Sequence, residues 1–455
     1  MEILLINPPI REWAKPNCMP LGLGYIAATL RNAGHFIDVL DINAHRYSKE
    51  IVSALLEERN PDIIMTGGII TVFKYLQWLT AVIGNLHPDI PVVLGGSVST
   101  SIPEIALRTM HADVACIGEG EITTVEVADR IDKGGGLEGV KGIWYKNKGR
   151  IIQNEPRPPI RDMDSIPFPA YDLFPMEIYV QNPVGYINRD KWGTGTKISD
   201  DIPRSMNINV TRGCPYRCGF CYHDYLGPGY RHRSPGHVLR EMDFLNERYG
   251  VTYFLWADDE AVVNARFIHD FCDLMVQSRR KYQFALAGRV NLMTEKMLTE
   301  LKEAGCNMVG YGIESGSQKI LDAMQKNVTV DQAKRAVRLT QKVFGDADCS
   351  FIIGYPGETE ETIQETAAFC KELNLAPEVI FFATAYPGTP LYRYALEQGL
   401  IRDEVEYISS LWEQGEQIAV NFTQWTDEDL YRRREDLIRE LKAWNVRRHS
   451  AGEKL

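Results

Sequence analysis

The chain has 455 residues, of which 44% are hydrophobic and 24% are charged, as in ordinary soluble globular proteins. Its 50 Lys and Arg and 61 Asp and Glu give a formal net charge of −11, which disfavours nucleic acid or an anionic membrane as the main partner. No apolar run reaches the ~18 residues of a membrane span, and the first residues, MEILLINPPI, lack the basic region of a signal peptide. We therefore expect a cytoplasmic protein without a transmembrane segment.

Short apolar runs alternate with helical patterns over the first 135 residues. Leu23, Ile26, Ala27 and Leu30, for example, recur at the spacing of one helix face, and Gly34 would end that helix. The expected strands are 2–6, 36–40, 62–66, 91–95 and 113–117. Apolar strands that alternate with helices predict a doubly wound, Rossmann-like parallel sheet in an α/β protein.

The segment 136–205 connects this region to a second one. Residues 142–153 have the pattern of a β-hairpin that turns at 147–149. Five prolines in 156–169 indicate a linker. Residues 176–205 show little periodicity, so we expect a long loop there that could act as a substrate lid.

A second alternation of strands and helices begins at residue 206. The expected strands are 206–210, 252–257, 283–288, 307–313, 348–354 and 378–383. Six β/α units are too few to close an eight-stranded barrel, so a partial (β/α)6 barrel of the TIM type is predicted. The predicted regions are 1–135, the first sheet; 136–205, the hairpin, linker and loop; 206–390, the partial barrel; and 391–455, a helical C-terminal region.

Three of the nine cysteines lie close together in the sequence TRGCPYRCGFCY. Cys214, Cys218 and Cys221 have the spacing C-x3-C-x2-C, and they follow an expected barrel strand at the end where barrel active sites form. Three thiolates on one short loop can hold three irons of a 4Fe–4S cluster. Because no fourth cysteine is near, the fourth iron would be open to another ligand.

Residues near this loop allow other interpretations. A structural zinc site could be completed by His223 or His232. Tyr222, Tyr225 and Trp256 lie near the expected site, where they could stack on an aromatic substrate or belong to the core.

The cysteine spacing, with the aromatic Phe220 before the last cysteine, resembles the signature of the radical S-adenosylmethionine (SAM) superfamily. The resemblance implies that Cys214, Cys218 and Cys221 bind a 4Fe–4S cluster. It also implies that the methionyl end of SAM chelates the open iron and that the reduced cluster cleaves SAM to a 5′-deoxyadenosyl radical.

Motifs at the ends of the other expected barrel strands also resemble this superfamily, in order along the chain. They are DDEA, GRVNL, GIESGS, FIIGYPGET and TAYPGTPLY. Many relatives have Asp-Asp-Asn-Phe in place of DDEA, so the sequence leaves open which acid binds the SAM amino group. The implied SAM contacts are Phe220, Asp258, Asp259, Glu260, Arg289, Glu314 and Ser315.

The first region lacks both a G-x-G-x-x-G after its first strand and a P-loop. Instead, LGGSVST and IGEGE end its fourth and fifth strands, and NPPI and PLGLGYIAATLRNAGH follow the first. This pattern resembles the cobalamin-binding domain that precedes many radical SAM domains. Small residues at strand ends suit a flat ligand that lies across the sheet edge. The implied cobalamin contacts are Thr66, Gly67, Gly68, Gly95, Gly96, Ser97, Gly118, Glu119 and Gly120.

Many cobalamin domains use an Asp-x-His-x-x-Gly motif to place a His under cobalt, and this sequence has none. The resemblance therefore implies base-off cobalamin without a His ligand. His35 and His45 are expected to be surface or capping residues. A domain that keeps the sheet but binds no cobalamin is the alternative.

The resemblance implies an enzyme that cleaves SAM reductively and functionalises an unactivated carbon, with C-methylation via methylcobalamin as the preferred reaction. An oxidative cyclase or ring-rearranging enzyme would keep both cofactors without methyl transfer. A methylthiotransferase fits poorly, because only Cys18 and Cys116 precede the triplet. A zinc-binding scaffold protein is the remaining alternative. The expected partners are a small-molecule substrate of unknown identity and an electron donor such as flavodoxin or ferredoxin, with no nucleic acid.

Overall fold

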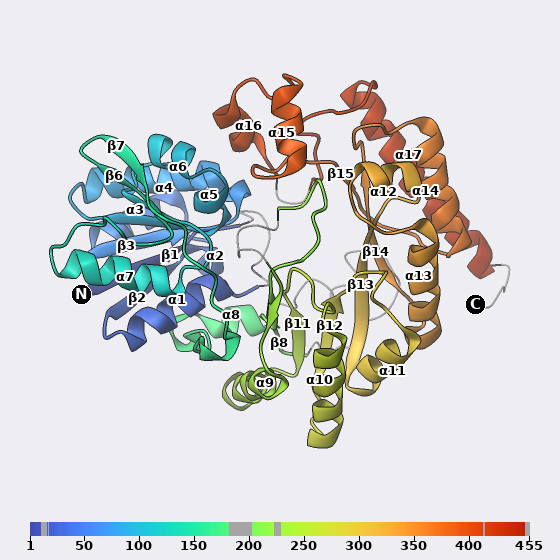
Figure 1. Cartoon of the computed structure of the whole chain (residues 1–455), viewed down its shortest axis with the longest axis horizontal. Helices are drawn as coiled ribbons and strands as arrows, with labels where there is room; N and C mark the ends of the chain where they lie inside the picture. The colour runs from blue at the N-terminus through green and yellow to red at the C-terminus, as the bar shows by residue number, and fades with distance from the viewer. Residues whose placement is uncertain (11–15, 17, 182–202, 223–228, 413–414, 451–455) are drawn as a thin grey trace.

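The structure is a computed structural model, which describes the chain except residues 11–15, 17, 182–202, 223–228, 413–414 and 451–455 and the side chains of 446–450. Two sheets lie side by side, each covered by helices, with a helical C-terminal part along the second (Figure 1). This arrangement confirms the predicted α/β fold.

The first sheet has seven strands in the order β2-β1-β3-β4-β5-β6-β7. The first five pair in parallel, and β6 and β7 continue the sheet as an antiparallel hairpin. The order of the parallel strands reverses between β1 and β3, the kind of switch point that opens a ligand crevice at the strands' carboxyl ends. The strands are β1 (Glu2–Asn7), β2 (Phe36–Asp41), β3 (Ile63–Gly67), β4 (Val92–Gly95), β5 (Val114–Cys116), β6 (Ile143–Asn147) and β7 (Arg150–Gln153).

Both faces of the first sheet are buried under helices. In β1, Ile3 and Leu5 belong to the core beneath α1 and α7, whereas Leu4 and Ile6 belong to the core beneath α3 and α4. This alternation explains why the central strands β1, β3 and β4 are largely apolar, as in other parallel sheets. The helices are α1 (Leu21–Asn32), α2 (Ile42–His45), α3 (Lys49–Glu57), α4 (Phe73–Leu86), α5 (Gly96–Ser101), α6 (Pro103–Thr109) and α7 (Glu121–Asp132).

The connecting segment is attached to the first sheet. Its hairpin forms where predicted and lengthens that sheet, so the sheet extends beyond residue 135. The proline-rich part that follows is irregular apart from two short 3-10 turns and leads into α8 (Met176–Gln181). Of the loop expected over 176–205, the first residues are therefore helical, and 182–202 lie outside the described residues.

The second sheet has six parallel strands in the order β15-β14-β13-β12-β11-β8, so successive strands of this sheet along the chain are also neighbours in space. The open, curled sheet confirms the predicted partial barrel (Figure 1). Its strands are β8 (Ser205–Ile208), β11 (Tyr253–Trp256), β12 (Gln283–Ala287), β13 (Cys306–Glu314), β14 (Asp348–Ile353) and β15 (Ile380–Phe382). A short hairpin, β9 (Thr211–Arg212) with β10 (Arg231–His232), flanks the cysteine loop. The outer helices are α9 (Pro235–Tyr249), α10 (Ala265–Ser278), α11 (Glu295–Glu303), α12 (Gln318–Ala323), α13 (Val330–Phe344) and α14 (Glu360–Glu372).

In the described part of the C-terminal region the helices are α15 (Pro390–Glu397), α16 (Glu404–Ser410) and α17 (Asp427–Ser450). The described residues between α16 and α17 are not helical, so the predicted helical tail is interrupted. Helix α17 packs along α14, while α16 contacts α4 of the first sheet and thereby joins both halves of the molecule.

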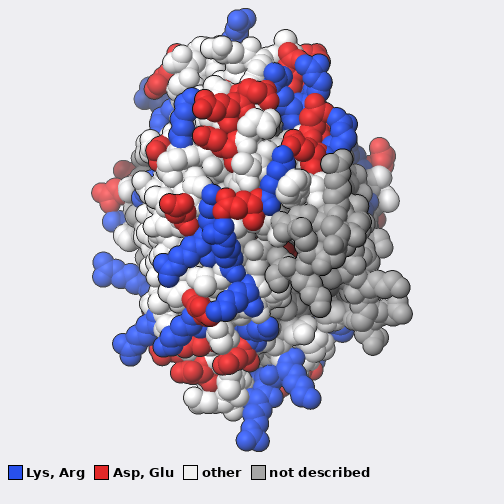
Figure 2. Space-filling view, turned by 90° about the vertical axis from the view of Figure 1, so that its right-hand side faces the viewer, with Lys and Arg blue, Asp and Glu red and all other residues white. Residues whose placement is uncertain are grey.

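Figure 2 shows the face that carries α13, α14 and α17, where Lys and Arg side chains are bordered by Asp and Glu. Ion pairs at 2.6 Å between Lys334 and Glu372 and at 2.5 Å between Lys342 and Glu295 belong to this surface. Such exposed pairs contribute only ~0–1 kcal/mol each. No helix among the described residues combines the length and apolar character needed to cross a bilayer.

Two glycines with positive φ offer a matched test of the barrel packing. Gly305 (φ 102°) precedes β13, and a Cβ there would lie 2.3 Å from the Tyr282 carbonyl oxygen. Gly345 (φ 89°) ends α13 with open space around it. We expect Gly345→Ala to cost about 1 kcal/mol for its backbone conformation alone. Gly305→Ala should cost clearly more, which thermal unfolding midpoints will measure; equal midpoints would contradict the contact.

Candidate functional site

The cysteine loop lies at the carboxyl end of β8 and is held by two other parts of the barrel. The Gly219 amide donates to the Met324 carbonyl at 2.7 Å, and the Leu391 amide donates to the Gly219 carbonyl at 2.9 Å. A Cβ on Gly219 would lie 2.7 Å from the Tyr355 hydroxyl, so the loop backbone approaches the barrel closely at this point. These contacts give the loop backbone a defined path at Gly219.

The three thiols differ in exposure. Cys218 is buried, Cys214 is half-buried and Cys221 is exposed. Partial burial raises the pKa of Cys214, and the nearby Glu260 and Cys218 add to the increase. Metal binding would override this increase, because a coordinating thiol is deprotonated. The described residues contain no group of three or more His, Cys, Asp or Glu placed to hold one metal ion; in a four-iron cluster each thiolate binds a separate iron.

Two of the three acids after β11 hold the backbone that precedes the cysteines. Asp258 Oδ1 accepts hydrogen bonds from the amides of Val210 and Thr211 at 2.8 and 2.9 Å. Asp259 Oδ2 accepts from the Gly213 amide at 2.9 Å. The DDE motif, predicted as a set of SAM contacts, thus also anchors the cysteine loop.

Glu260 is the least engaged acid of this motif. It is buried, and the hydrogen bond that its carboxyl accepts from the Val262 amide is long at 3.4 Å. Burial raises the pKa of the Glu260 carboxyl to about 7, although the positive charges of the nearby Arg289 and Lys326 lower it. A buried carboxyl beside the thiols, with spare acceptor capacity, is suited to bind a ligand amino group.

Arg289, at the end of β12, carries a buried guanidinium with unused donors. It lies 3.7 Å over the Tyr216 ring, and its Nη1 is 3.7 Å from the Cys218 sulfur. Its Nε and Nη2 are buried without a hydrogen-bond partner among the described residues. Unsatisfied buried donors are costly in a native protein. This site therefore fits an anionic ligand group beside the cysteines.

Glu314 occupies a strained position at the end of β13. Its φ of 68° is unusual for a residue other than glycine, and the pairing with β14 shifts register just before it. Its Oε1 accepts from Lys326 Nζ at 2.8 Å, and both side chains are buried. Lys326 also lies 5.7 Å from the centre of the Phe220 ring, which links it to the cysteine loop. No pattern in the sequence indicated Lys326 as a residue of the site.

Ser315 is engaged with its own turn and with α14. Its hydroxyl is 3.3 Å from the Thr366 hydroxyl and accepts from the Ser317 amide at 3.1 Å. A Cβ on Gly316 would lie 2.7 Å from the Thr366 Cα, so this turn packs directly on the helix. The structure thus brings the GIESGS segment to the same end of the barrel as the cysteines and fixes its shape.

At the edge of the first sheet, the glycines predicted to contact cobalamin allow the turns after β3 and β4 to pack against each other. A Cβ on Gly67 would lie 2.2 Å from the Gly95 carbonyl oxygen, and one on Gly96 would lie 2.5 Å from that of Gly68. Thr66 donates its hydroxyl to the Ile6 carbonyl at 3.0 Å. The turns after β3 and β4 therefore form one compact ledge at the strands' carboxyl ends.

The turn after β5 lies next to this ledge. The Gly118 amide donates to the Thr100 hydroxyl at 3.0 Å, and a Cβ on Gly120 would lie 2.7 Å from Ile26. Ser97, partly exposed at the start of α5, accepts a hydrogen bond from Ser101 at its carbonyl. The nine predicted cobalamin contacts thus lie on three adjacent strand ends.

The side chain of Glu119 points toward the barrel. It accepts from Arg212 at 2.9 Å and from Arg231 at 2.8 Å, and Arg212 also pairs with Glu121 at 2.6 Å. All four side chains are nearly inaccessible to solvent. The structure therefore gives the Glu119 carboxylate partners in the cysteine-loop hairpin. No local pattern predicts this link, because 93 residues separate Glu119 from Arg212.

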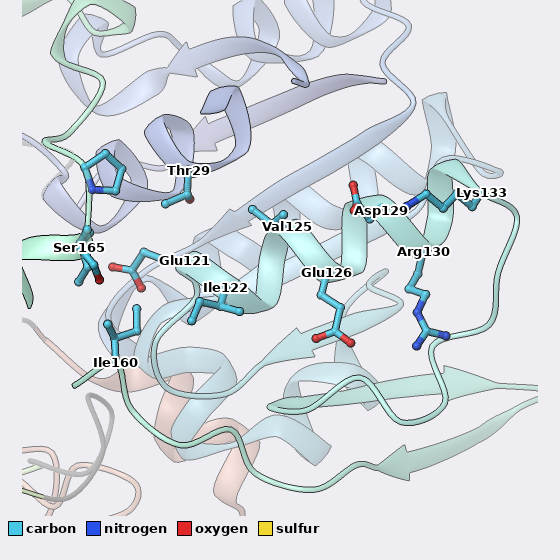
Figure 3. A pocket seen from close by; sticks show the side chains of 12 residues that line it. Thr29, Glu121, Ile122, Val125, Glu126, Asp129, Arg130, Lys133, Ile160 and Ser165 are labelled. Atoms are coloured by element: carbon cyan, nitrogen blue, oxygen red, sulfur yellow. Dashed lines mark hydrogen bonds and ion pairs between the residues drawn. The ribbon is translucent and has the colours of Figure 1, made fainter. Parts of the chain in front are cut away.

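Two cavities adjoin these elements. One, of about 540 Å³, runs along α7 between Ile122 and Val125 on one side and Ile160 and Ser165 of the connecting segment on the other (Figure 3). A second, of about 690 Å³, lies between the residues after β1 and β3 and the segment after α16, with Lys49 at its rim. The second cavity opens at the switch point of the first sheet, where a ligand crevice is expected.

The histidine and tryptophan near the site have structural partners. His232 uses one ring nitrogen toward the Arg233 carbonyl at 3.0 Å and the other toward Asn264 at 2.9 Å. These contacts leave it no nitrogen for zinc. Trp256 stacks on Phe284 at 5.3 Å inside the core, as the packing interpretation expected. His223 and Tyr225 lie outside the described residues.

Comparisons with known proteins agree with this geometry. Residues 208–370 match the radical SAM superfamily, and residues 10–128 match the B12 binding domain. An uncharacterized methyltransferase of Pyrococcus horikoshii is 31% identical, over 88% of this chain and 84% of the relative. The anaerobic magnesium-protoporphyrin IX monomethyl ester cyclase of Rubrivivax gelatinosus is 28% identical, over 86% of this chain and 70% of the relative. The structure of the radical SAM methyltransferase TsrM of Kitasatospora setae has the same fold, with a TM-score of 0.69 and 20% identity over 88% of this chain and 77% of that one.

The raised pKa of Glu260 predicts a pH-dependent stability. Its carboxyl keeps a proton up to about pH 7 when folded but loses it near the ordinary value of 4.5 when unfolded. Folding stability therefore falls as pH rises through this window, and Glu260→Gln removes the fall. In the cofactor-free protein, the thermal midpoint of the variant relative to wild type should be higher at about pH 8 than at about pH 5. The exposed Glu397→Gln is the control, and an equal difference at both pH values would contradict the prediction.

Proposed function

Because the chain belongs to the radical SAM enzymes that carry a B12-binding domain, we propose that it methylates an unactivated carbon of a small molecule, using a 4Fe–4S cluster, SAM and cobalamin. The observation that supports this proposal most is the site at the barrel edge: three thiols on one loop beside Arg289, whose buried Nε and Nη2 lack a partner among the described residues. The methyltransferase relative that aligns over 88% of the chain supports methyl transfer as the reaction.

In this proposal Cys214, Cys218 and Cys221 hold three irons of the cluster. Arg289 supplies donors for the carboxylate of SAM, and Glu260 supplies an acceptor for its amino group. When bound, the cofactors supply the difficult chemistry, namely a carbon radical from SAM and a methyl group carried on cobalt. The chain's own task is to orient these groups and to keep water away from them.

The buried pair Glu314–Lys326 contributes to this orientation. Both charges are satisfied by one another, so Lys326 can hold the Glu314 carboxylate in place beneath the cysteine loop. A strained backbone at Glu314 is the kind of feature that surrounding structure maintains at functional sites. We therefore include Glu314, Lys326 and Ser315 among the residues that would position SAM.

For cobalamin, the ledge after β3 and β4 and the turn after β5 offer a glycine-rich surface where backbone can approach a flat ligand. His35 directly precedes β2, so it lies at the amino end of the parallel strands, away from the ledge at their carboxyl ends. This position and the absence of the Asp-x-His-x-x-Gly motif support binding in the base-off form without a His ligand.

Cyclisation is the second candidate, because a cyclase relative aligns over 86% of the chain. Both reactions would use the same cofactors and, as we propose, an electron donor such as flavodoxin or ferredoxin. They differ in the fate of SAM, since only methyl transfer consumes it as a methyl donor.

Loss of one cysteine should remove the cluster and spare cobalamin. After anaerobic reconstitution, wild type should hold about four irons per chain, and Cys218→Ala should lose most of them because one iron has no thiolate. Cys272→Ala, in a buried position on α10, is the control and should keep the iron. Iron and cobalt analysis with an absorption spectrum measures both cofactors. Full iron in Cys218→Ala would refute the assignment.

The products of SAM distinguish the two reactions without knowledge of the substrate. Wild type reconstituted with hydroxocobalamin, SAM and a reductant should form S-adenosylhomocysteine as well as 5′-deoxyadenosine, because methyl transfer would consume one SAM as the methyl donor. Chromatography with mass detection measures both. Formation of 5′-deoxyadenosine alone would refute methyl transfer and favour cyclisation.

A further inference from the structure

We propose that Glu119 is a positioning residue that sets the distance between the two cofactors, acting through Arg212. The inference rests on the proposed function, because it assumes a cluster on the cysteine loop and cobalamin at the edge of the first sheet. It goes further in assigning the link between them to a particular pair of side chains.

One end of this link is Glu119 itself. Its backbone lies between Gly118 and Gly120, in the turn proposed to contact cobalamin. That turn is fixed in the first sheet, since Gly118 donates to Thr100 and Gly120 packs against Ile26. Any movement of the Glu119 carboxylate relative to the sheet is therefore limited to its side chain.

The other end is Arg212, two residues before Cys214. Its Nη1 donates to Glu119 Oε1 at 2.9 Å, and its Nη2 donates to Glu121 Oε1 at 2.6 Å. Arg231, paired with Arg212 across the short hairpin, donates to both Glu119 oxygens at 2.8 and 2.9 Å. Two arginines on the barrel side thus form ion pairs with two glutamates on the first-sheet side.

A second set of contacts carries the link to the acids of the site. Arg212 Nε donates to Asn209 Oδ1 at 3.3 Å, and Asn209 Nδ2 donates to Asp258 Oδ1 at 2.9 Å. The next residue, Gly213, is held by Asp259 at 2.9 Å. Glu119 is therefore connected, through Arg212 and Asn209, to the acids that hold the residues just before Cys214.

The two glutamates and two arginines have balanced charges, and their burial makes the geometry specific. The side chains of Glu119 and Arg212 are each 5% exposed. Removing one partner of a buried ion pair leaves an uncompensated charge. Well-packed apolar side chains would hold the two domains together as firmly, so binding strength alone does not explain the charges. A directional charged link instead fixes one relative position, the role best documented for buried ionic groups. Group transfer is sensitive to placement on the scale of 1 Å.

The test measures the separation of the cofactors directly and needs no substrate. The protein is reconstituted with hydroxocobalamin and a 4Fe–4S cluster, and both centres are reduced to their paramagnetic forms. Pulsed electron paramagnetic resonance then reports the magnetic dipolar coupling between them. Glu119→Asp, which keeps the charge but shortens the side chain, should shift the coupling outside the spread of wild-type repeats. Glu119→Gln, which weakens the grip on both arginines, should broaden it.

The matched control is Glu126→Gln, also on the first-sheet side, which breaks an ion pair to Arg157 in the connecting segment. This variant loses an ion pair that does not involve the cysteine-loop hairpin, so it should keep the wild-type dipolar coupling. Iron and cobalt contents are measured for every variant, and the coupling is compared among chains that hold both centres. Coupling in both Glu119 variants identical to wild type would overturn the inference while leaving the proposed function intact. Wild type without cobalt would instead refute the proposed function, and this inference with it.

Discussion

Carboxylate oxygens that accept hydrogen bonds from backbone amides determine the shape of the site. Asp258 holds the amides of Val210 and Thr211, and Asp259 holds that of Gly213, so the chain enters the cysteine loop on a fixed path. Hydrogen bonds to a charged acceptor are stronger than neutral ones, and buried amides need partners. Burial nonetheless raises the pKa of Asp258 to about 7, because desolvation disfavours the negative charge that strengthens these hydrogen bonds.

The same loop is tied to the first sheet as well as to the barrel. Parallel strands deliver their loops to one edge of a sheet, and in this chain the loops after β5 and β8 meet in the buried contact of Glu119 with Arg212. Apolar contacts add to this junction, since Met324 and Leu391 of the barrel side belong to one core cluster with Leu4 and Ile6 of β1. The two halves therefore share both a core and a charged link.

Much of this arrangement could be predicted from the sequence, because it depends on local patterns. Apolar runs and turn residues predicted both parallel sheets, and the C-x3-C-x2-C spacing located the site on the loop after β8. Contacts between distant residues carry no such local signal: the Lys326 partner of Glu314 stands in an ordinary polar stretch. Asp258 was predicted as a ligand contact, and no pattern indicated that its Oδ1 would be occupied by backbone amides.

The crossed pairs of Glu119 and Glu121 with Arg212 and Arg231 also constrain how the two halves can be recombined. Both glutamates belong to the turn and helix after β5, and both arginines belong to the short hairpin beside the cysteine loop. The side chains of all four are nearly inaccessible to solvent. A chimera that joins this barrel to the cobalamin-type sheet of a relative would bury arginines without acids unless the donor sheet carries both glutamates. A sheet and a barrel can therefore be exchanged between relatives only when all four residues are matched. The same four residues would show whether a new barrel, with a new substrate range, can be joined to this sheet.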